Sequence, residues 1–121
     1  MYEIMIKTEF ASAHNLRDYN GLCEALHGHN WKVDIVVESE TLDKTGLAID
    51  FKILKSAAAE IINDLDHTYL NDHHEFKDKN PSSENIAKYI YDELKSSLPD
   101  NVKMKKITVW ETDGAAASYY V

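Results

Sequence analysis

The chain has 121 residues and a formal net charge of −8 at neutral pH, and its composition is 44% hydrophobic and 28% charged. This is the composition of a globular protein, and its acidic charge disfavours nucleic acid and anionic membranes as partners. No stretch approaches the ~20 apolar residues of a membrane span. The length suits a single domain over residues 1–121. One cysteine cannot form an internal disulfide, so we expect the protein in the reducing cytoplasm.

The first part of the chain predicts two strands. Residues 2–16 and 29–40 alternate apolar and polar side chains with the period of two that a half-buried strand requires. Between them, Asn20-Gly21 is typical of a loop.

Two helices are predicted next, over residues 50–67 and 82–98. Their apolar side chains recur at spacings of three and four, which gives each helix one apolar face. Asp50 is expected to cap the first helix and Ser82 or Ser83 the second, because their side-chain oxygens can accept a hydrogen bond from a free first-turn N–H.

The chain closes with two predicted strands, residues 103–112 and 115–121, joined by the hairpin signal Asp113-Gly114. The element order is therefore β-β-α-α-β-β, which indicates an α+β fold with a four-stranded antiparallel sheet. Two helices can cover only one face of four strands. Both sheet edges remain open, and assembly into a larger barrel would remove them.

Three histidines lie near the facing ends of the first two predicted strands. His27 and His29 are two residues apart, so on a strand they share a face, and a loop of about a dozen residues can return His14 to them. Three neutral imidazoles suit zinc and leave its fourth position open, as in a catalytic site. Cys23 as a fourth ligand would instead close the site as a structural centre, and the residues alone leave both arrangements open.

Two carboxylates and one imidazole are candidates for proton transfer or substrate binding. Asp66 can orient the adjacent His67, although a histidine at a helix end also simply suits the helix dipole. Glu111 is either an exposed turn residue or a pocket acid whose two oxygens fit the N–H and NH₂ edge of a pterin or guanine. His73 and His74 fall in a polar stretch, and we expect both to be solvent-exposed.

Six segments in chain order carry motifs of one family. They are FASAHNL (10–16), CEALHGHN (23–30), GLAIDFKILK (46–55), LDHTYLND (65–72), NPSSENIA (80–87) and VWET (109–112). Together they resemble the 6-pyruvoyltetrahydropterin synthase and 6-carboxytetrahydropterin synthase family along the whole chain. The departures are small: Ser12 replaces a common Ala, and Ser82 and Ser83 stand where Thr is common.

The resemblance implies a lyase with the T-fold, whose subunits pair edge to edge into a barrel and whose two trimers stack into a homohexamer. It implies that His14, His27 and His29 bind Zn²⁺. The open position of the metal would then take the side-chain hydroxyls of the substrate, 7,8-dihydroneopterin triphosphate.

The resemblance also implies roles for the other candidates. Cys23 would be the general base rather than a ligand, and Asp66 and His67 of a neighbouring subunit would complete its proton relay. Glu111 would anchor the pterin ring. The pterin pocket would also be lined by two residues at the start of the second helix, Ser83 and Glu84.

The short chain, without an N-terminal extension, looks most like the 6-carboxytetrahydropterin synthase of queuosine (7-deazaguanine) biosynthesis, which releases acetaldehyde and triphosphate. Glu24 leaves alternatives open, because one branch of the family has a glutamate here in place of the cysteine and makes 6-hydroxymethyl-7,8-dihydropterin for folate. Another product in the family is 6-pyruvoyltetrahydropterin. Since Cys23 is present, we expect Glu24 to be a solvated loop residue. A hypothesis of a different class is a binding domain without turnover, with zinc closed in by Cys23.

Overall fold

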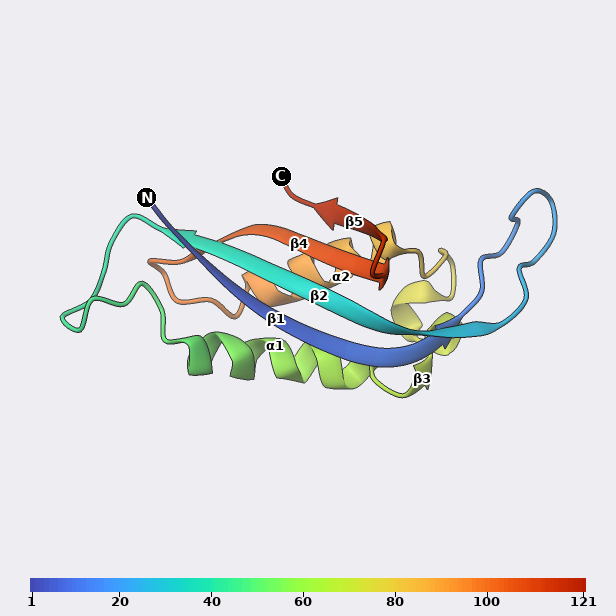
Figure 1. Ribbon diagram of the computed structural model, residues 1–121, viewed down its shortest axis with the longest axis horizontal. Helices are drawn as coiled ribbons and strands as arrows, with labels where there is room; N and C mark the ends of the chain where they lie inside the picture. Colours follow the sequence, from blue (N-terminus) through green and yellow to red (C-terminus); the bar gives the residue numbers. More distant parts are fainter.

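The computed structural model describes residues 1–121 and contains the six predicted strands and helices, with small shifts at their ends (Figure 1). The strands and α-helices are β1 Tyr2–His14, β2 His27–Ser39, α1 Phe51–Leu65, β3 Thr68–Tyr69, α2 Ser83–Lys95, β4 Lys103–Thr112 and β5 Ala115–Tyr119. Two 3₁₀ helices lie between β3 and α2, η1 Leu70–Asp72 and η2 His74–Phe76. These helices and both α-helices are all too short or too polar to span a membrane.

The sheet has five strands in the order β3-β1-β2-β4-β5, so the prediction of four antiparallel strands is wrong. The additional strand, β3, pairs parallel to β1, with Thr68 beside Ser12 and Tyr69 beside Ala13. Two residues in a polar stretch are too few to show an alternating pattern. β3 is instead held by tertiary contacts, among them a hydrogen bond of 2.6 Å from the His67 N–H to the Ala11 carbonyl.

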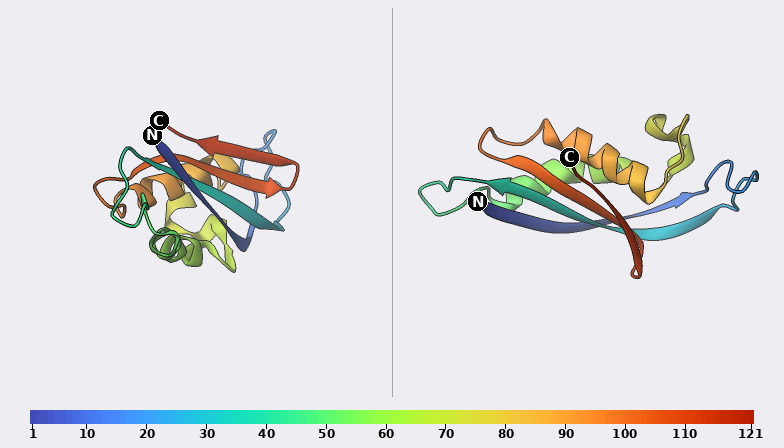
Figure 2. Two further views of the ribbon diagram at one scale, coloured as in Figure 1. Left: turned by 60° about the vertical axis from the view of Figure 1, so that its left-hand side comes forward. Right: turned by 90° about the horizontal axis from the view of Figure 1, so that it is seen from above.

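Both α-helices cover the same face of the sheet, as predicted (Figure 2). Their apolar stripes and the inward side chains of β1, β2 and β4 form a core cluster of 23 buried residues. The predicted caps are present, because the Asp50 carboxylate accepts from the Lys52 N–H and the Ser82 hydroxyl accepts from the Asn85 N–H. The stripe of α1 is narrower than predicted, since Ile53 is exposed.

At one end of the sheet, the side chains that face the helices are no longer apolar. They belong instead to residue types that can bind a metal. On β2, His27 and His29 share the face of the fully buried Trp31, and the register of the antiparallel ladder pairs His14 with His27. On β4, a bulge leaves Glu111 without a partner on β5. A bulge of this kind changes the direction in which the side chain of its extra residue points. Three strands therefore bring four metal-ligating side chains to one end of the sheet.

Candidate metal centre

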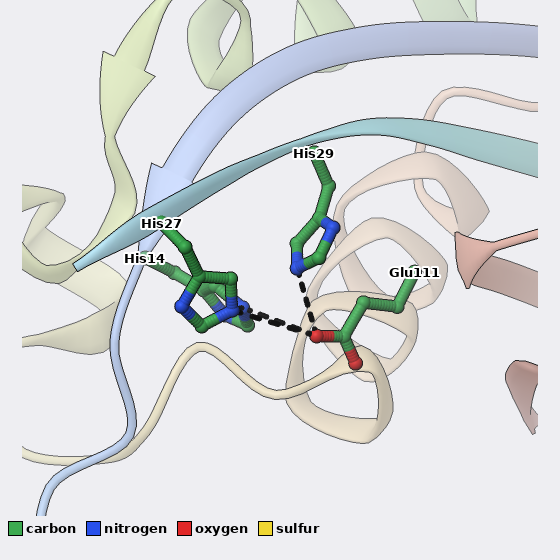
Figure 3. Close-up of side chains that lie close together, drawn as sticks. All are labelled: His14, His27, His29 and Glu111. Atoms are coloured by element: carbon green, nitrogen blue, oxygen red, sulfur yellow. Dashed lines mark hydrogen bonds and ion pairs between the residues drawn. The ribbon is translucent and has the colours of Figure 1, made fainter. Parts of the chain in front are cut away.

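Four ligand atoms, one each from His14, His27, His29 and Glu111, lie within 4.8 Å of one another (Figure 3). Oε1 of Glu111 is 2.9 Å from Nε2 of His29, 3.4 Å from that of His14 and 3.8 Å from that of His27. The side chain of His14 is only 1% exposed. The structure thus brings the three predicted histidines together and adds Glu111 to them.

The hydrogen bonds of two histidines determine which ring nitrogens carry a proton. Nδ1 of His14 lies 2.8 Å from the Pro81 carbonyl, and Nδ1 of His27 lies 2.8 Å from the Ala25 carbonyl. A carbonyl only accepts, so both Nδ1 atoms must donate. In the neutral rings both Nε2 atoms are then acceptors, yet they face each other at 3.0 Å beside a carboxylate. Such a convergence of lone pairs beside a carboxylate could hold a metal ion.

The third histidine supports the same conclusion. Nε2 of His29 is buried, and the polar atom of the cluster that lies close to it is Oε1 of Glu111, at 2.9 Å. Burial lowers the pKa of His29, which favours the neutral, metal-binding form of the ring. The rings of His14 and His29 both meet Trp31 edge to face, which fixes their orientation. Three imidazoles and one carboxylate form a donor set that fits zinc.

Cys23 and Glu24 differ in how they are held in the loop between β1 and β2. The Cys23 thiol is exposed and is not among the converging ligand atoms. The Glu24 carboxylate accepts a 3.2 Å hydrogen bond from the Leu16 N–H and lies 3.8 Å from Nδ1 of His27. Glu24 is thus a loop residue whose carboxylate is partly exposed and is held by a backbone donor beside a candidate ligand.

Asp66 and His67 form a pair outside the metal cluster. Nδ1 of His67 lies 2.8 Å from Oδ2 of Asp66, and Oδ1 of Asp66 accepts a 2.8 Å hydrogen bond from the Ala11 N–H. The Ala11 N–H, and after it the His67 ring, hold the pKa of Asp66 below its usual value. The His67 side chain is 82% exposed, so this chain fixes the carboxylate and leaves the imidazole projecting into solvent.

Ser83 and Glu84 begin α2 next to the metal centre. Pro81, two residues before α2, supplies the carbonyl that orients His14, so the start of this helix lies beside a candidate ligand. Ser83 is buried and Glu84 is exposed. Neither side chain belongs to the converging cluster.

The model of the family described as 6-pyruvoyl tetrahydropterin synthase matches residues 3–121. The chain belongs to this family. A dihydroneopterin monophosphate aldolase of Pyrococcus furiosus is 36% identical over 108 residues, which cover 89% of this chain and 88% of that protein. A 6-carboxy-5,6,7,8-tetrahydropterin synthase of Synechocystis sp. is 34% identical over 126 residues, covering 99% and 94%.

The fold is that of a solved family member. The structure of Caenorhabditis elegans 6-pyruvoyl tetrahydropterin synthase superimposes with a TM-score of 0.83 at 24% identity, covering 99% of this chain and 95% of that one. This likeness confirms the predicted T-fold of the subunit.

A second Asp–His pair, Asp64 and His73, was not predicted from the sequence. Nε2 of His73 lies 2.6 Å from Oδ2 of Asp64, and its side chain is only 6% exposed, so the expectation that His73 is solvent-exposed is wrong. His74 is exposed, as expected. Tyr89 packs against His73, and burial raises the pKa of Tyr89 to about 12. A histidine in a polar stretch gives no sign of this burial, because the covering ring comes from α2.

Proposed function

We propose that the chain is a zinc-dependent 6-carboxytetrahydropterin synthase. It would convert 7,8-dihydroneopterin triphosphate into 6-carboxy-5,6,7,8-tetrahydropterin, acetaldehyde and triphosphate, in the biosynthesis of queuosine. The observation that carries the proposal is the convergence of three imidazole lone pairs and one carboxylate on a single point. The name of the Synechocystis relative supports the choice of product.

The proposed chemistry is a set of proton transfers beside a Lewis acid. His14, His27 and His29 would hold the zinc, which would supply a Lewis acid able to polarise the side-chain oxygen of the substrate and acidify the adjacent C–H. Cys23 takes the proton, because its exposed thiol is accessible to a substrate bound over the cluster. His67, oriented by Asp66, returns the proton.

The substrate contacts follow from where the carboxylates lie. Glu111 faces the three histidines, so its oxygens would meet the side-chain hydroxyls of the substrate at the metal as well as the pterin beyond them. Ser83 and Glu84, at the start of α2, would line the pterin pocket. Carboxylate oxygens are suitable acceptors for the N–H and NH₂ edge of that ring.

The proposed working form is a homohexamer, a dimer of trimers, with its sites between subunits. Two features support it. The outer edge of β5 has no partner, and β3 covers only Ser12 and Ala13 of the outer edge of β1, so both edges can accept another strand. The largely exposed imidazole of His67 is free to serve a neighbouring subunit.

One observation favours a second candidate function, a lyase that releases 6-hydroxymethyl-7,8-dihydropterin. The Glu24 carboxylate is bonded to the Leu16 N–H and lies beside His27, where it can act as an acid or base. The Pyrococcus furiosus relative is named an aldolase, which is the chemistry that cuts the substrate side chain in this way.

Product identification tests the proposal. The zinc-loaded protein is incubated with 7,8-dihydroneopterin triphosphate, the pterins are resolved by mass spectrometry, and the variant His14→Ala serves as the control. We expect mainly 6-carboxytetrahydropterin with acetaldehyde. Mainly 6-hydroxymethyl-7,8-dihydropterin would replace the proposal by the second candidate. A folded, zinc-loaded protein without turnover would contradict both candidates and favour a binding domain.

A further inference from the structure

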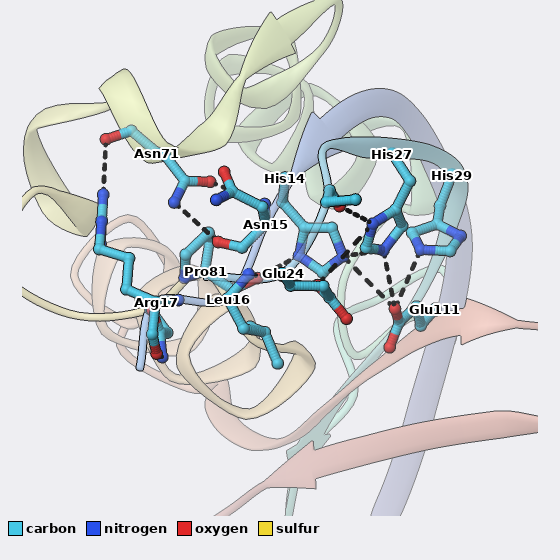
Figure 4. A network of polar contacts seen from close by, with 12 residues as sticks. His14, Asn15, Leu16, Arg17, Glu24, His27, His29, Asn71, Pro81 and Glu111 are labelled. Atoms are coloured by element: carbon cyan, nitrogen blue, oxygen red, sulfur yellow. Dashed lines mark hydrogen bonds and ion pairs between the residues drawn. The ribbon is translucent and has the colours of Figure 1, made fainter. Parts of the chain in front are cut away.

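The backbone between His14 and the β1–β2 loop is held at three consecutive residues. Asn15, Leu16 and Arg17 lie beyond the end of β1, where the ladder with β2 no longer satisfies their N–H and C=O groups. Each of the three nevertheless both donates and accepts a hydrogen bond, as Figure 4 shows for Asn15. Buried and half-buried backbone groups require such partners.

Two asparagine side chains supply the partners of the outer two residues. Oδ1 of Asn71 accepts from the Asn15 N–H at 3.0 Å, and its Nδ2 donates to the Asn15 carbonyl at 2.8 Å. Asn80 does the same for Arg17, accepting from its N–H at 2.7 Å and donating to its carbonyl at 2.9 Å. We call the side chains of Asn71 and Asn80 the asparagine clamp.

The middle residue is bonded to Glu24. The Leu16 N–H donates to Oε1 of Glu24 at 3.2 Å, and the Leu16 carbonyl accepts from the Glu24 N–H at 2.8 Å. The position of Glu24 therefore depends on the position of Leu16, which the asparagine clamp fixes from both sides.

We propose that Asn71 and Asn80 are positioning residues, which hold residues 15–17 so that the loop segment with Cys23 and Glu24 keeps its place beside His27. Its catalytic consequence rests on the proposed function. Because Cys23 and Glu24 are adjacent, the clamp sets the position of whichever of them moves the proton. Asn71 lies a few residues after the Asp66–His67 pair, and Asn80 directly precedes Pro81, whose carbonyl orients His14. Both clamp residues therefore lie in segments that also contribute to the site in another way.

The sheet, rather than the clamp, holds the backbone of the metal ligands. His14, His27 and His29 belong to the ladder between β1 and β2, which pairs His14 with His27 and Ser12 with His29. Loss of the clamp should thus release the loop and leave the metal bound. A misplacement of about 1 Å at a reacting group can cost roughly 100-fold in rate.

The test compares three zinc-loaded variants with the parent protein. Asn80→Ala removes one half of the clamp. Asn71→Asp keeps the size of the buried Asn71 and its acceptor oxygen but loses the donor to the Asn15 carbonyl. Asn101→Ala is the matched control, because the Asn101 amide donates to the Ala48 carbonyl, a contact remote in sequence from both clamp segments. Zinc content, amide hydrogen exchange over residues 15–24, kcat and KM are measured for each.

We expect Asn80→Ala and Asn71→Asp to keep zinc and to exchange the amides of residues 15–24 about tenfold faster than the parent. Their kcat should fall about 10- to 100-fold, with KM changed less than about twofold, because the pterin contacts lie elsewhere. Asn101→Ala should match the parent in all four measurements.

Unchanged exchange in both clamp variants, or loss of zinc from both, would overturn the proposal. An equal fall of kcat in Asn101→Ala would also overturn it. If the parent itself does not turn over the substrate, the proposed function fails separately. Amide hydrogen exchange then tests the positioning role of the clamp by itself. Faster exchange confined to residues 15–24 of the clamp variants supports that role, and exchange like that of the parent overturns it.

Discussion

The metal cluster and the Asp66–His67 pair differ in how much of their surroundings one chain supplies. In the cluster, the ring of His14 is buried and its Nδ1 is fixed by the Pro81 carbonyl, so the ligand is oriented before any metal arrives. In the pair, only the carboxylate is fixed, by the Ala11 N–H, and the His67 imidazole projects into solvent.

This difference fits the proposal that two copies of the chain contribute to one site. A preorganised metal site needs rigid strands and carbonyl partners for its ligands, and a single sheet provides them. A proton relay needs its imidazole next to the base, and the imidazole of His67 is paired with Asp66 and 82% exposed. Under the proposed function, one chain would supply all the metal ligands, and a neighbouring copy would supply the relay.

The largest expected effect separates the two regions directly. His14→Ala removes a proposed metal ligand. Loss of a residue that only hydrogen-bonds to a ligand can already weaken metal binding roughly 100-fold, so the zinc Kd of this variant should rise by more than that. Turnover should vanish. His67→Ala should bind zinc as the parent does. Zinc content after dialysis against a competing chelator measures both. Zinc loss from His67→Ala would break the distinction between the two regions.

Cys23→Ala tests whether the thiol belongs to the metal or to the reaction. Because Cys23 lies outside the converging cluster, the variant should keep its zinc and its unfolding free energy. Loss of a general base should lower kcat about 100- to 10,000-fold. Metal content, urea unfolding and steady-state rates check these expectations. A variant that unfolds or loses zinc would show that the thiol closes a structural site.

Glu111→Gln tests the one carboxylate that faces the cluster. The three histidines remain, so we expect zinc to stay bound, while KM rises about tenfold because a charge-assisted acceptor for the substrate is lost. Titration with a substrate analogue and zinc analysis provide the measurement. Unchanged affinity and turnover would reduce Glu111 to an ordinary end-of-strand residue.

The smallest expected effect concerns the Asp64–His73 pair, whose imidazole is buried where that of His67 is exposed. The hydrogen bond from His73 lowers the pKa of Asp64 below its unfolded value of about 3.9. Its contribution to stability is therefore present above pH 4 and is lost as the pH falls through the lowered folded pKa.

Asp64→Asn should accordingly lower the free energy of unfolding at neutral pH, by less than about 1 kcal/mol because Asp64 is half-exposed. The difference from the parent should shrink towards pH 3. Urea unfolding at both values measures it, with Asp100→Asn at an exposed position as a surface control. A difference that does not change with pH would mean that the pair acts through packing instead.

Local pattern and motif predicted most of the fold and the ligand set. The alternation along β1 and β2 placed the three histidines on one face, and the caps at Asp50 and Ser82 were visible in the sequence. What the sequence could not reveal depends on distant partners. β3 exists only because of β1, Glu24 is held only because Leu16 lies beside it, and His73 is buried only because Tyr89 covers it.

The central claim is that one subunit supplies the metal and its neighbour supplies the relay. The most direct test mixes His14→Ala with His67→Ala, each inactive by itself, and reassembles them into mixed oligomers. The account predicts recovered turnover, because some sites then combine an intact His14 with an intact His67 from the adjacent copy. Mixed oligomers that form and remain inactive would contradict it.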